Sequence, residues 1–225
     1  MADRDSPEGR IVTYRLAIFD FDGTLADSFP WFLQRFNDLA DRHRFNRIEA
    51  HEVEALRGNS ARQMMAHLRL PAWRLPLVAR DMRAWMAKDI HTLRPFPGVP
   101  EMLHALADAG VVLAIVTSNS YENVQRVLGP EAAGLMAFVE CGASMFGKRA
   151  RFRRVLRCSG IPAAQAISIG DEIRDAEAAR AAGIDFGAVA WGYTSPASLR
   201  AQSPALFFDS VEDIVQALVG PVSRP

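Results

Sequence analysis

The sequence predicts an α/β fold, in which a parallel sheet carries helices on both faces and is interrupted by an α-helical insertion. Short apolar runs bounded by turn residues alternate with segments of helical periodicity, as they do in βαβ units. Residues 27–94 break this alternation, because they hold several helical apolar patterns and no convincing strand. At 225 residues, the chain is long enough for one large domain or two smaller ones.

Six apolar runs are the expected strands. The run 16–19 ends at Asp20. The run 111–116 is aliphatic throughout, which is typical of parallel strands that are buried on both faces. The full set of expected strands is 16–19, 111–116, 138–141, 166–169, 186–191 and 206–208.

Helical periodicity fills the segments between these runs. In the last of them, Val211, Ile214 and Leu218 recur at the spacing of one helix face. Outside the insertion, the expected helices are 98–109, 120–128, 148–159, 172–182 and 210–219.

The helical insertion divides the chain into an α/β core and a second helical domain. The insertion ends at Pro95-Phe96-Pro97-Gly98, a rigid turn segment. We expect the tails at the two ends of the chain to be poorly ordered. The expected parts are a core of 11–26 and 95–220, a helical domain of 27–94, and tails of 1–10 and 221–225.

Composition excludes several classes of protein. The 26 basic and 26 acidic residues give a net charge of zero, which argues against a nucleic-acid binder. The longest aliphatic run is far short of the roughly 20 residues that cross a bilayer, and residues 1–10 contain no apolar secretion signal. Cys141 and Cys158 make neither a disulfide framework nor a metal cluster. We therefore expect a cytoplasmic protein with no nucleic-acid or membrane partner.

Polar side chains with catalytic potential follow three of the expected strands. Asp20 follows the first strand, Thr117 the second and Asp171 the fourth. Ligands of open parallel sheets bind outside the carboxyl ends of the strands. We therefore expect these three side chains to meet in one crevice.

Carboxylates are concentrated at two of these strand ends. Asp20 and Asp22 are separated by one residue before the turn at Gly23, and the segment 171–175 adds Asp171, Glu172 and Asp175. Carboxylates that share a pocket repel one another unless a cation neutralises them. Oxygen ligands of this kind suit Mg²⁺.

A simpler interpretation of the same residues remains open. Asp171 and Asp175 are also suited to capping and charging the start of the following helix. Thr117, Ser118 and Ser120 are equally suited to a turn or an N-cap. Placement at three separate strand ends favours the shared site.

Lysine is rare in this chain, which makes Lys148 a candidate. The sequence has 24 arginines and only two lysines, Lys88 and Lys148. Position 148 therefore favours a compact ammonium group over a planar guanidinium.

With these residues assembled, the chain resembles the haloacid dehalogenase superfamily of phosphohydrolases over nearly its whole length. Residues 20–28 match the family's first motif in full, and Val116-Thr117-Ser118-Asn119 resembles the second. Lys148 stands where the third motif has its lysine, and residues 169–175 match the fourth motif, with its trailing helix at 178–183.

The resemblance implies a Rossmann-like core with a small α-helical cap at 27–94, and it favours the phosphoglycolate-phosphatase-like branch. The proline that usually follows the third-motif lysine is absent, since the chain reads Gly147-Lys148-Arg149-Ala150. Arg57-Gly58-Asn59-Ser60 resembles the cap loop that approaches substrate. Alternatively, Gly58 ends a helix and Ser60 caps the next one.

The resemblance also implies a role for each site residue. Asp20 is the nucleophile, Asp22 is the general acid and base, and Thr117 and Lys148 hold the phosphoryl group. Further substrate-binding positions are Gly23, Ser118, Asn119 and Arg57. Mg²⁺ is held by Asp20, the backbone carbonyl of Asp22 and Asp171, with Asp175 and Glu172 in support.

These roles imply a Mg²⁺-dependent phosphatase that hydrolyses a small phosphate monoester through an aspartyl-phosphate. Phosphoglycolate is one candidate substrate. A sugar-phosphate phosphomutase shares the same motifs, and a catalytically idle binding protein is a third alternative. We expect a small phosphorylated metabolite as the partner, and a monomer or a homodimer.

Overall fold

The computed structural model describes residues 14–59, 61–142 and 147–220. Its six strands form one sheet in the order β3-β2-β1-β4-β5-β6, and every pairing in that sheet is parallel. The predicted α/β class is therefore confirmed. The strands are β1 (Leu16–Phe19), β2 (Val112–Val116), β3 (Met136–Glu140), β4 (Ala166–Gly170), β5 (Asp185–Val189) and β6 (Leu206–Phe208).

The central strand β1 lies between β2 and β4, and all four of its residues are buried. In the register of the sheet, Phe19 at the end of β1 pairs with Ile115 of β2 and Ile169 of β4. The chain therefore leaves three neighbouring strands at the same edge of the sheet.

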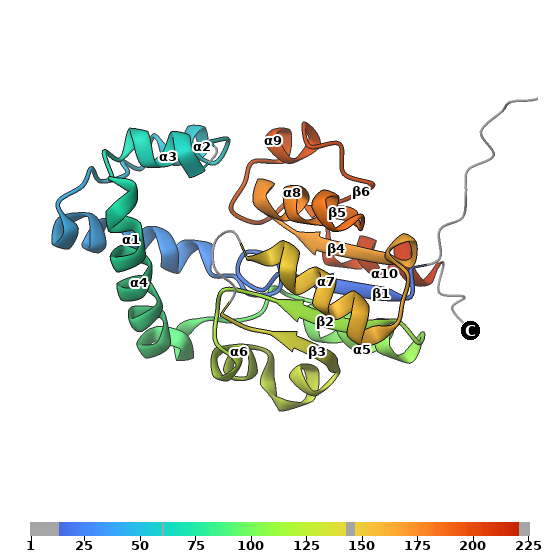
Figure 1. Ribbon diagram of the computed structural model, residues 1–225. Helices are drawn as coiled ribbons and strands as arrows, with labels where there is room; N and C mark the ends of the chain where they lie inside the picture. The colour runs from blue at the N-terminus through green and yellow to red at the C-terminus, as the bar shows by residue number, and fades with distance from the viewer. Residues whose placement is uncertain (1–13, 60, 143–146, 221–225) are drawn as a thin grey trace, which may run out of the picture.

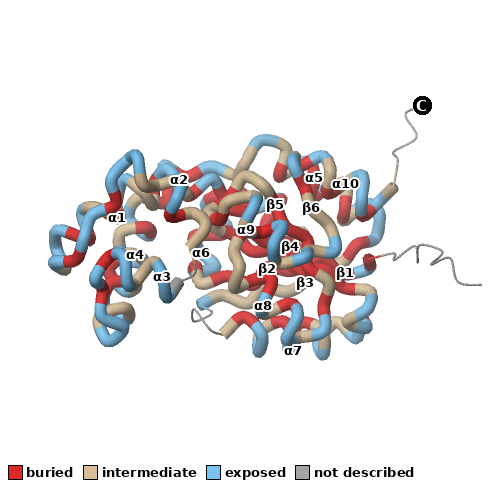
Figure 2. The backbone as a smooth tube through the Cα atoms, turned by 90° about the horizontal axis from the view of Figure 1, so that it is seen from above, coloured by how far each residue is buried: buried red, intermediate tan, exposed pale blue. Residues whose placement is uncertain are grey.

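Helices cover both faces of the sheet, and β1 contributes alternate residues to the two layers. Ala17 and Phe19 pack with α5 (Val99–Asp108), α6 (Tyr121–Gly134) and α10 (Val211–Val219). Leu16 and Ile18 pack on the other face with α7 (Lys148–Ser159), α8 (Ile173–Ala182) and α9 (Pro196–Arg200). The period of two in a strand produces this division. Burial is concentrated in these central strands (Figure 2).

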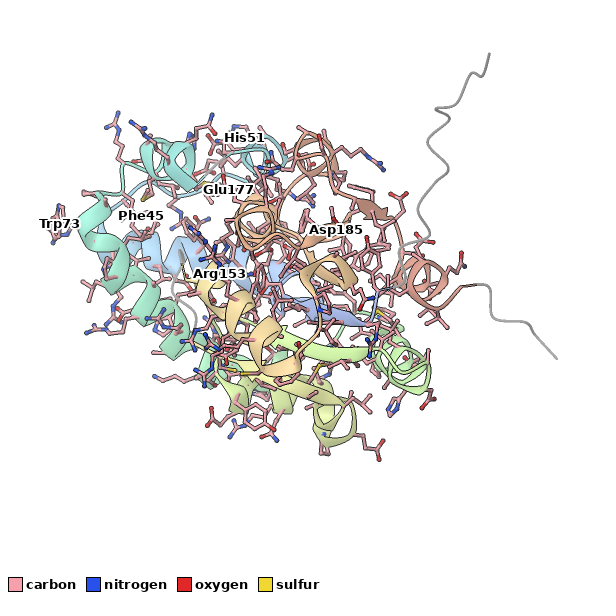
Figure 3. All side chains as sticks on the ribbon, turned by 45° about the vertical axis from the view of Figure 1, so that its right-hand side comes forward. Phe45, His51, Trp73, Arg153, Glu177 and Asp185 are labelled. Atoms are coloured by element: carbon pink, nitrogen blue, oxygen red, sulfur yellow. The ribbon has the colours of Figure 1, made fainter. Side chains whose placement is uncertain are left out.

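The segment between β1 and α5 is helical. It contains α1 (Phe29–His43), α2 (Val53–Leu56), α3 (Ala61–His67) and α4 (Leu75–Asp89), with short 3-10 helices at Ala72–Arg74 and Ile90–Thr92; a further 3-10 helix, Ala163–Gln165, precedes β4. The helices between β1 and α5 lie beyond the carboxyl ends of the strands (Figure 1). They enclose an apolar cluster of their own, which includes Phe36, Leu39 and Leu68. Trp73 projects from the outer end of this helical segment (Figure 3) and is 73% exposed.

Two short connections, residues 25–27 and 94–96, join the helical segment to the core and hydrogen-bond to each other. The Asp27 N–H donates to the Arg94 carbonyl over 2.9 Å, and the Phe96 N–H donates to the Leu25 carbonyl over 2.9 Å. Ala26 and Pro95 form an antiparallel bridge between these two bonds. The chain thus enters and leaves the helical segment at neighbouring points.

Strand β3 is Met136–Glu140 rather than 138–141, and three larger differences from the sequence prediction follow. Helix α6 continues to Gly134, because the chain resumes helical geometry after a break at Gly129 (φ 79°) and Pro130. Strand β5 ends at Val189, so residues 190–195 form a loop. Helix α9 was not expected from the apolar pattern.

The tails predicted to be poorly ordered (1–10 and 221–225), Ser60 and most of the loop before Lys148 lie outside the described residues. Among the described residues, no helix is both long and apolar enough to span a bilayer.

Candidate active site

An ammonium group lies between two carboxylates at the edge of the sheet. Lys148 begins α7, and its Nζ lies 2.6 Å from an oxygen of Asp20 and forms a second ion pair with Asp175. All three side chains are at most 6% exposed. Burial alone would lower the pKa of Lys148, but the charges of Asp175 and Asp20 outweigh this effect and raise it. Lys148 is therefore held as a cation beside Asp20.

Asp171 adds a third buried carboxylate to the cluster. Carboxylate oxygens of Asp20, Asp171 and Asp175 all lie within 4.8 Å of one another. Burial raises the pKa of Asp20 to about 7 against the opposing charge of Lys148, and burial with nearby carboxylates raises the pKa of Asp171. One lysine does not balance three carboxylates. Hard oxygen donors with excess negative charge fit a divalent cation such as Mg²⁺.

Both oxygens of the Asp171 side chain accept hydrogen bonds. The Thr24 hydroxyl donates to Oδ1 over 2.6 Å, and the backbone N–H of Tyr193 donates to Oδ2 over 2.7 Å. These two donors fix the plane of the carboxylate, which leaves the remaining lone pairs with a defined direction.

Asp22 is held separately from the three clustered carboxylates. The Asn119 side-chain amide donates to Asp22 over 3.2 Å. Desolvation raises the pKa of Asp22, and hydrogen bonds from Asn119 and Ser28 oppose that rise. A carboxyl group with a raised pKa holds a proton more readily, as a group that gives and takes protons must.

The turn after β2 contains Thr117, Ser118 and Asn119, and it brings Asn119 to Asp22. Thr117 is fully buried, and its hydroxyl accepts the Asn119 backbone N–H over 2.9 Å. The turn interpretation of Thr117 therefore describes its geometry correctly. Because a hydroxyl also has one O–H to donate, it does not exclude a second role. Ser118 is half-buried at the same edge.

The turn after β1 requires glycine at position 23. Gly23 has a φ of 75°, and a Cβ built there would lie 2.4 Å from Asp171 Oδ2 and 2.4 Å from the Tyr193 ring. Its N–H donates to the Ala26 carbonyl over 2.9 Å. Gly23 therefore contributes a close backbone approach here, and this particular N–H is not directed at a substrate.

The family model for haloacid dehalogenase-like hydrolases matches residues 17–189. The chain belongs to this family.

Relatives and solved structures agree with this membership. The chain is 31% identical over 202 residues to a phosphoglycolate phosphatase of Synechococcus elongatus, covering 89% of this chain and 95% of that protein. It is 30% identical to one from Agrobacterium fabrum, covering 80% and 82%. A haloacid dehalogenase-like hydrolase from Streptococcus pneumoniae superposes with a TM-score of 0.74 at 22% identity, covering 90% and 97%. CbbY from Rhodobacter sphaeroides, in complex with phosphate, gives 0.69 at 19%, covering 89% and 96%. The expected resemblance to the phosphoglycolate-phosphatase-like branch is confirmed.

In this haloacid dehalogenase-like hydrolase, the start of α8 has two functions at once. Asp175 Oδ2 accepts the Glu172 N–H over 3.2 Å as part of a capping box, while Oδ1 pairs with Lys148. The helix-capping interpretation and the shared-site interpretation of Asp175 therefore both describe the geometry. Glu172 itself forms an ion pair with Arg174 at 2.5 Å.

Arg174 is a site residue that the sequence interpretation missed. Its charge favours the ionised forms of Asp20 and Asp22. Its Nε is buried and has no hydrogen-bond partner in the described part of the chain. A signal was available, because a cation in the first turn of a helix opposes the helix dipole and calls for a specific reason.

In the structure, Arg57 reaches the core, where its guanidinium donates to backbone carbonyls. Its Nη2 donates to the Gly192 carbonyl over 2.7 Å and its Nε to the Tyr193 carbonyl over 3.2 Å. The ring of Phe29 lies 5.3 Å from its guanidinium carbon. Substrate binding by Arg57 stays a prediction, since these donors are engaged with the core in this structure.

The loop 190–195 is the largest part of the site that sequence reasoning missed. It follows β5 and reaches the edge where Asp20 and Asp171 lie, through the Tyr193–Asp171 bond. The rule about strand ends applied to it equally. The loop was not predicted for two reasons. The expected strand extended to Trp191, and the residues that follow it, 192–195, include no charged side chain.

Gly192→Ala is expected to lower the free energy of unfolding by about 1–3 kcal/mol. The added Cβ would lie 2.2–2.4 Å from side-chain atoms of Asp171, so the loop or the carboxylate has to shift. Gly134→Ala is the matched control, because its Cβ meets nothing within 4 Å, and it should stay within about 1 kcal/mol of wild type. Urea unfolding measures both variants. Equal stability of the two would contradict the close packing at Gly192.

Proposed function

We propose that this chain is a Mg²⁺-dependent phosphatase that hydrolyses a small phosphate monoester through an aspartyl-phosphate at Asp20. Phosphoglycolate is one candidate substrate, since relatives of about 30% identity carry that name. The observation that carries the proposal is the buried cluster of Asp20, Asp171 and Asp175, with Lys148 Nζ 2.6 Å from Asp20. A nucleophilic carboxylate beside a fixed cation and a candidate metal site fits phosphoryl transfer.

The proposed reaction has two steps. In the first, a carboxylate oxygen of Asp20 bonds to phosphorus, the bond from phosphorus to the alcohol oxygen breaks, and Asp22 gives that oxygen a proton. In the second, Asp22 takes a proton from water, the water oxygen bonds to phosphorus, and Asp20 is released with inorganic phosphate. The raised pKa of Asp22 supports its role in both transfers.

Two further groups of residues complete the proposed site. Thr117 and Lys148 bind the phosphoryl oxygens, with Ser118 and Asn119 beside them. Asp20, Asp171 and the backbone carbonyl of Asp22 hold Mg²⁺, with Asp175 and Glu172 in support. When bound, Mg²⁺ supplies positive charge against the phosphoryl oxygens.

We propose that residues 27–94 act as a cap that selects the leaving group above a core of 11–26 and 95–220. A cavity of about 180 Å³ lies where α1 and α2 face the loops after β4 and β5. Phe29 and Leu56 contribute apolar surface to it, and Arg57 and Glu172 contribute charge. Its position beside Tyr193 supports contact with the alcohol part of the ester. A cytoplasmic location, and a monomer or homodimer, stay predictions.

Phosphate release from a panel of esters tests the proposed function. The panel includes phosphoglycolate, p-nitrophenyl phosphate and sugar phosphates, each with Mg²⁺ and with EDTA. Release that requires Mg²⁺ is the expected result, and the ranking of esters identifies the preferred leaving group. Conversion of one sugar phosphate into another without release of phosphate would instead indicate a phosphomutase.

The stabilisation that Mg²⁺ gives is expected to grow with pH. Without metal, the pKa of Asp20 is raised to about 7, and that of Asp171 is also raised. A carboxyl group whose pKa is higher in the folded state than in the unfolded state, where it is about 4, loses its stabilising contribution as pH rises through the folded-state value. Mg²⁺ neutralises the same groups and competes with protons for them. The gain in melting temperature with Mg²⁺ should be larger at about pH 7.5 than at about pH 5.5, and the reverse order would contradict the metal site.

A further inference from the structure

The loop 190–195 contacts the carboxylate cluster on one side. The Tyr193 N–H donates to Asp171 Oδ2 over 2.7 Å, and the Thr194 N–H donates to the Asp171 carbonyl over 3.3 Å. Gly192 lies directly against Asp171, since a Cβ built there would be 2.2 Å from the Asp171 Cβ. The loop therefore determines the position of Asp171.

The same loop contacts the helical segment on its other side. Arg57 Nη2 donates to the Gly192 carbonyl over 2.7 Å, and the Ser195 N–H donates to the Arg57 carbonyl over 2.9 Å. The Tyr193 ring packs edge-on against Phe29, with centroids 5.0 Å apart. Helices α2 and α9 face each other across this contact in Figure 1.

One peptide group connects the two sides. The carbonyl of Gly192, which accepts from Arg57, and the N–H of Tyr193, which donates to Asp171, belong to the same peptide unit. A trans peptide is planar, so its C=O and N–H point in opposite directions and turn together. The Arg57 guanidinium, which donates to the Gly192 carbonyl, fixes the plane of this peptide group. It also polarises the peptide group, which strengthens the Tyr193 N–H as a donor.

We propose that Arg57 is a positioning residue that acts through the Gly192–Tyr193 peptide group to orient the Asp171 carboxylate. The contact of the helical segment with the loop then helps to hold Asp171 in its Mg²⁺-binding geometry. This inference rests on the proposed function, because that function makes Asp171 a metal ligand. Since Thr24 holds the other oxygen of Asp171, loss of Arg57 removes one of two constraints, and we expect a partial loss of metal affinity.

Three variants of the full chain test the proposal without substrate. Arg57→Met removes the donors but keeps a stem over Phe29, Arg57→Lys keeps the charge, and Arg83→Met alters an exposed arginine on α4 as the control. The readouts are the Mg²⁺ dissociation constant by calorimetry and the exchange rate of the Tyr193 amide hydrogen by NMR. Arg57→Met should weaken Mg²⁺ binding roughly 10-fold and speed exchange at Tyr193. Arg57→Lys should recover part of both, and Arg83→Met should change neither.

Kinetics separate this role from direct contact with substrate. Arg57→Met should lower kcat equally for phosphoglycolate and for ethyl phosphate, which lacks the carboxylate, and leave the KM for both esters unchanged. A higher KM for phosphoglycolate alone, with unchanged Mg²⁺ affinity, would make Arg57 a substrate ligand and overturn the proposal. A lower melting temperature with unchanged Mg²⁺ affinity and exchange would also overturn it.

The exchange measurement requires neither activity nor metal. If the wild type hydrolyses no ester, the proposed function fails, whereas the connection from Arg57 to Tyr193 still receives its own result. Unchanged exchange at Tyr193 in Arg57→Met would overturn that connection even in an active phosphatase.

Discussion

Asp20→Asn is expected to lower phosphate release by roughly 10⁴-fold or more, because the amide cannot serve as the nucleophile. The fold should survive, since asparagine has nearly the same shape. Removing one of three buried carboxylates also relieves their mutual repulsion, so the melting temperature without Mg²⁺ should stay the same or rise. Single-turnover phosphate release and thermal unfolding measure the two effects.

Asp108→Asn is the matched control for this variant. Asp108 is exposed at the end of α5, just before the start of β2, whereas the site lies where the strands end. It should retain wild-type activity and stability. An Asp20→Asn enzyme with more than about a tenth of wild-type activity would contradict a nucleophilic role for Asp20.

Lys148→Met is expected to lower both activity and stability. Methionine removes the cation that pairs with Asp20 and Asp175, so two buried carboxylates lose their partner. Removing one member of a buried ion pair costs about 3–5 kcal/mol in the free energy of unfolding. The loss should grow as pH rises, because protonation then no longer neutralises the carboxylates. Urea unfolding in EDTA at two pH values measures it.

The other lysine of the chain provides the control. Lys88 is exposed near the end of α4, and Lys88→Met should stay within about 0.5 kcal/mol of wild type at both pH values. Phosphate release should fall strongly in Lys148→Met alone. Equal stability of the two variants would show that Lys148 is not the main counter-ion of the cluster.

The sequence contained enough information to predict the centre of the site. Asp20, Thr117 and Asp171 each follow a short apolar run, and parallel strands bring such positions to one edge whatever the loops between them do. Lys148 is one of only two lysines among many arginines, and its match to the third motif distinguishes it from Lys88. These predictions depend on local pattern and on one general property of sheets.

Two of the contacts that the sequence did not predict, those of Tyr193 with Asp171 and of Arg57 with Gly192, depend on the path of the loop 190–195. Tyr193 reaches Asp171 through a backbone N–H, which any residue except proline possesses, so its identity gives no signal. Arg57 reaches Gly192 from a separate helix, and nothing in the spacing of the two predicts that contact. Hydrogen bonds made by the backbone across long sequence separations are therefore the part of this site that required the structure.

The two hydrogen-bonded connections of the helical segment, 25–27 and 94–96, have a consequence for how such enzymes diversify. Because Asp27 bonds to Arg94 and Leu25 to Phe96, the sheet is joined to the segment at what amounts to a short closed hairpin. Lengthening a loop raises the entropic cost of closing it only slightly, by about 0.6 kcal/mol for each doubling of its length. Helices of another length or sequence can therefore replace this segment without displacing Asp20. Under the proposed function, the segment that selects the leaving group and the core that carries out the chemistry at phosphorus are therefore open to separate evolutionary change.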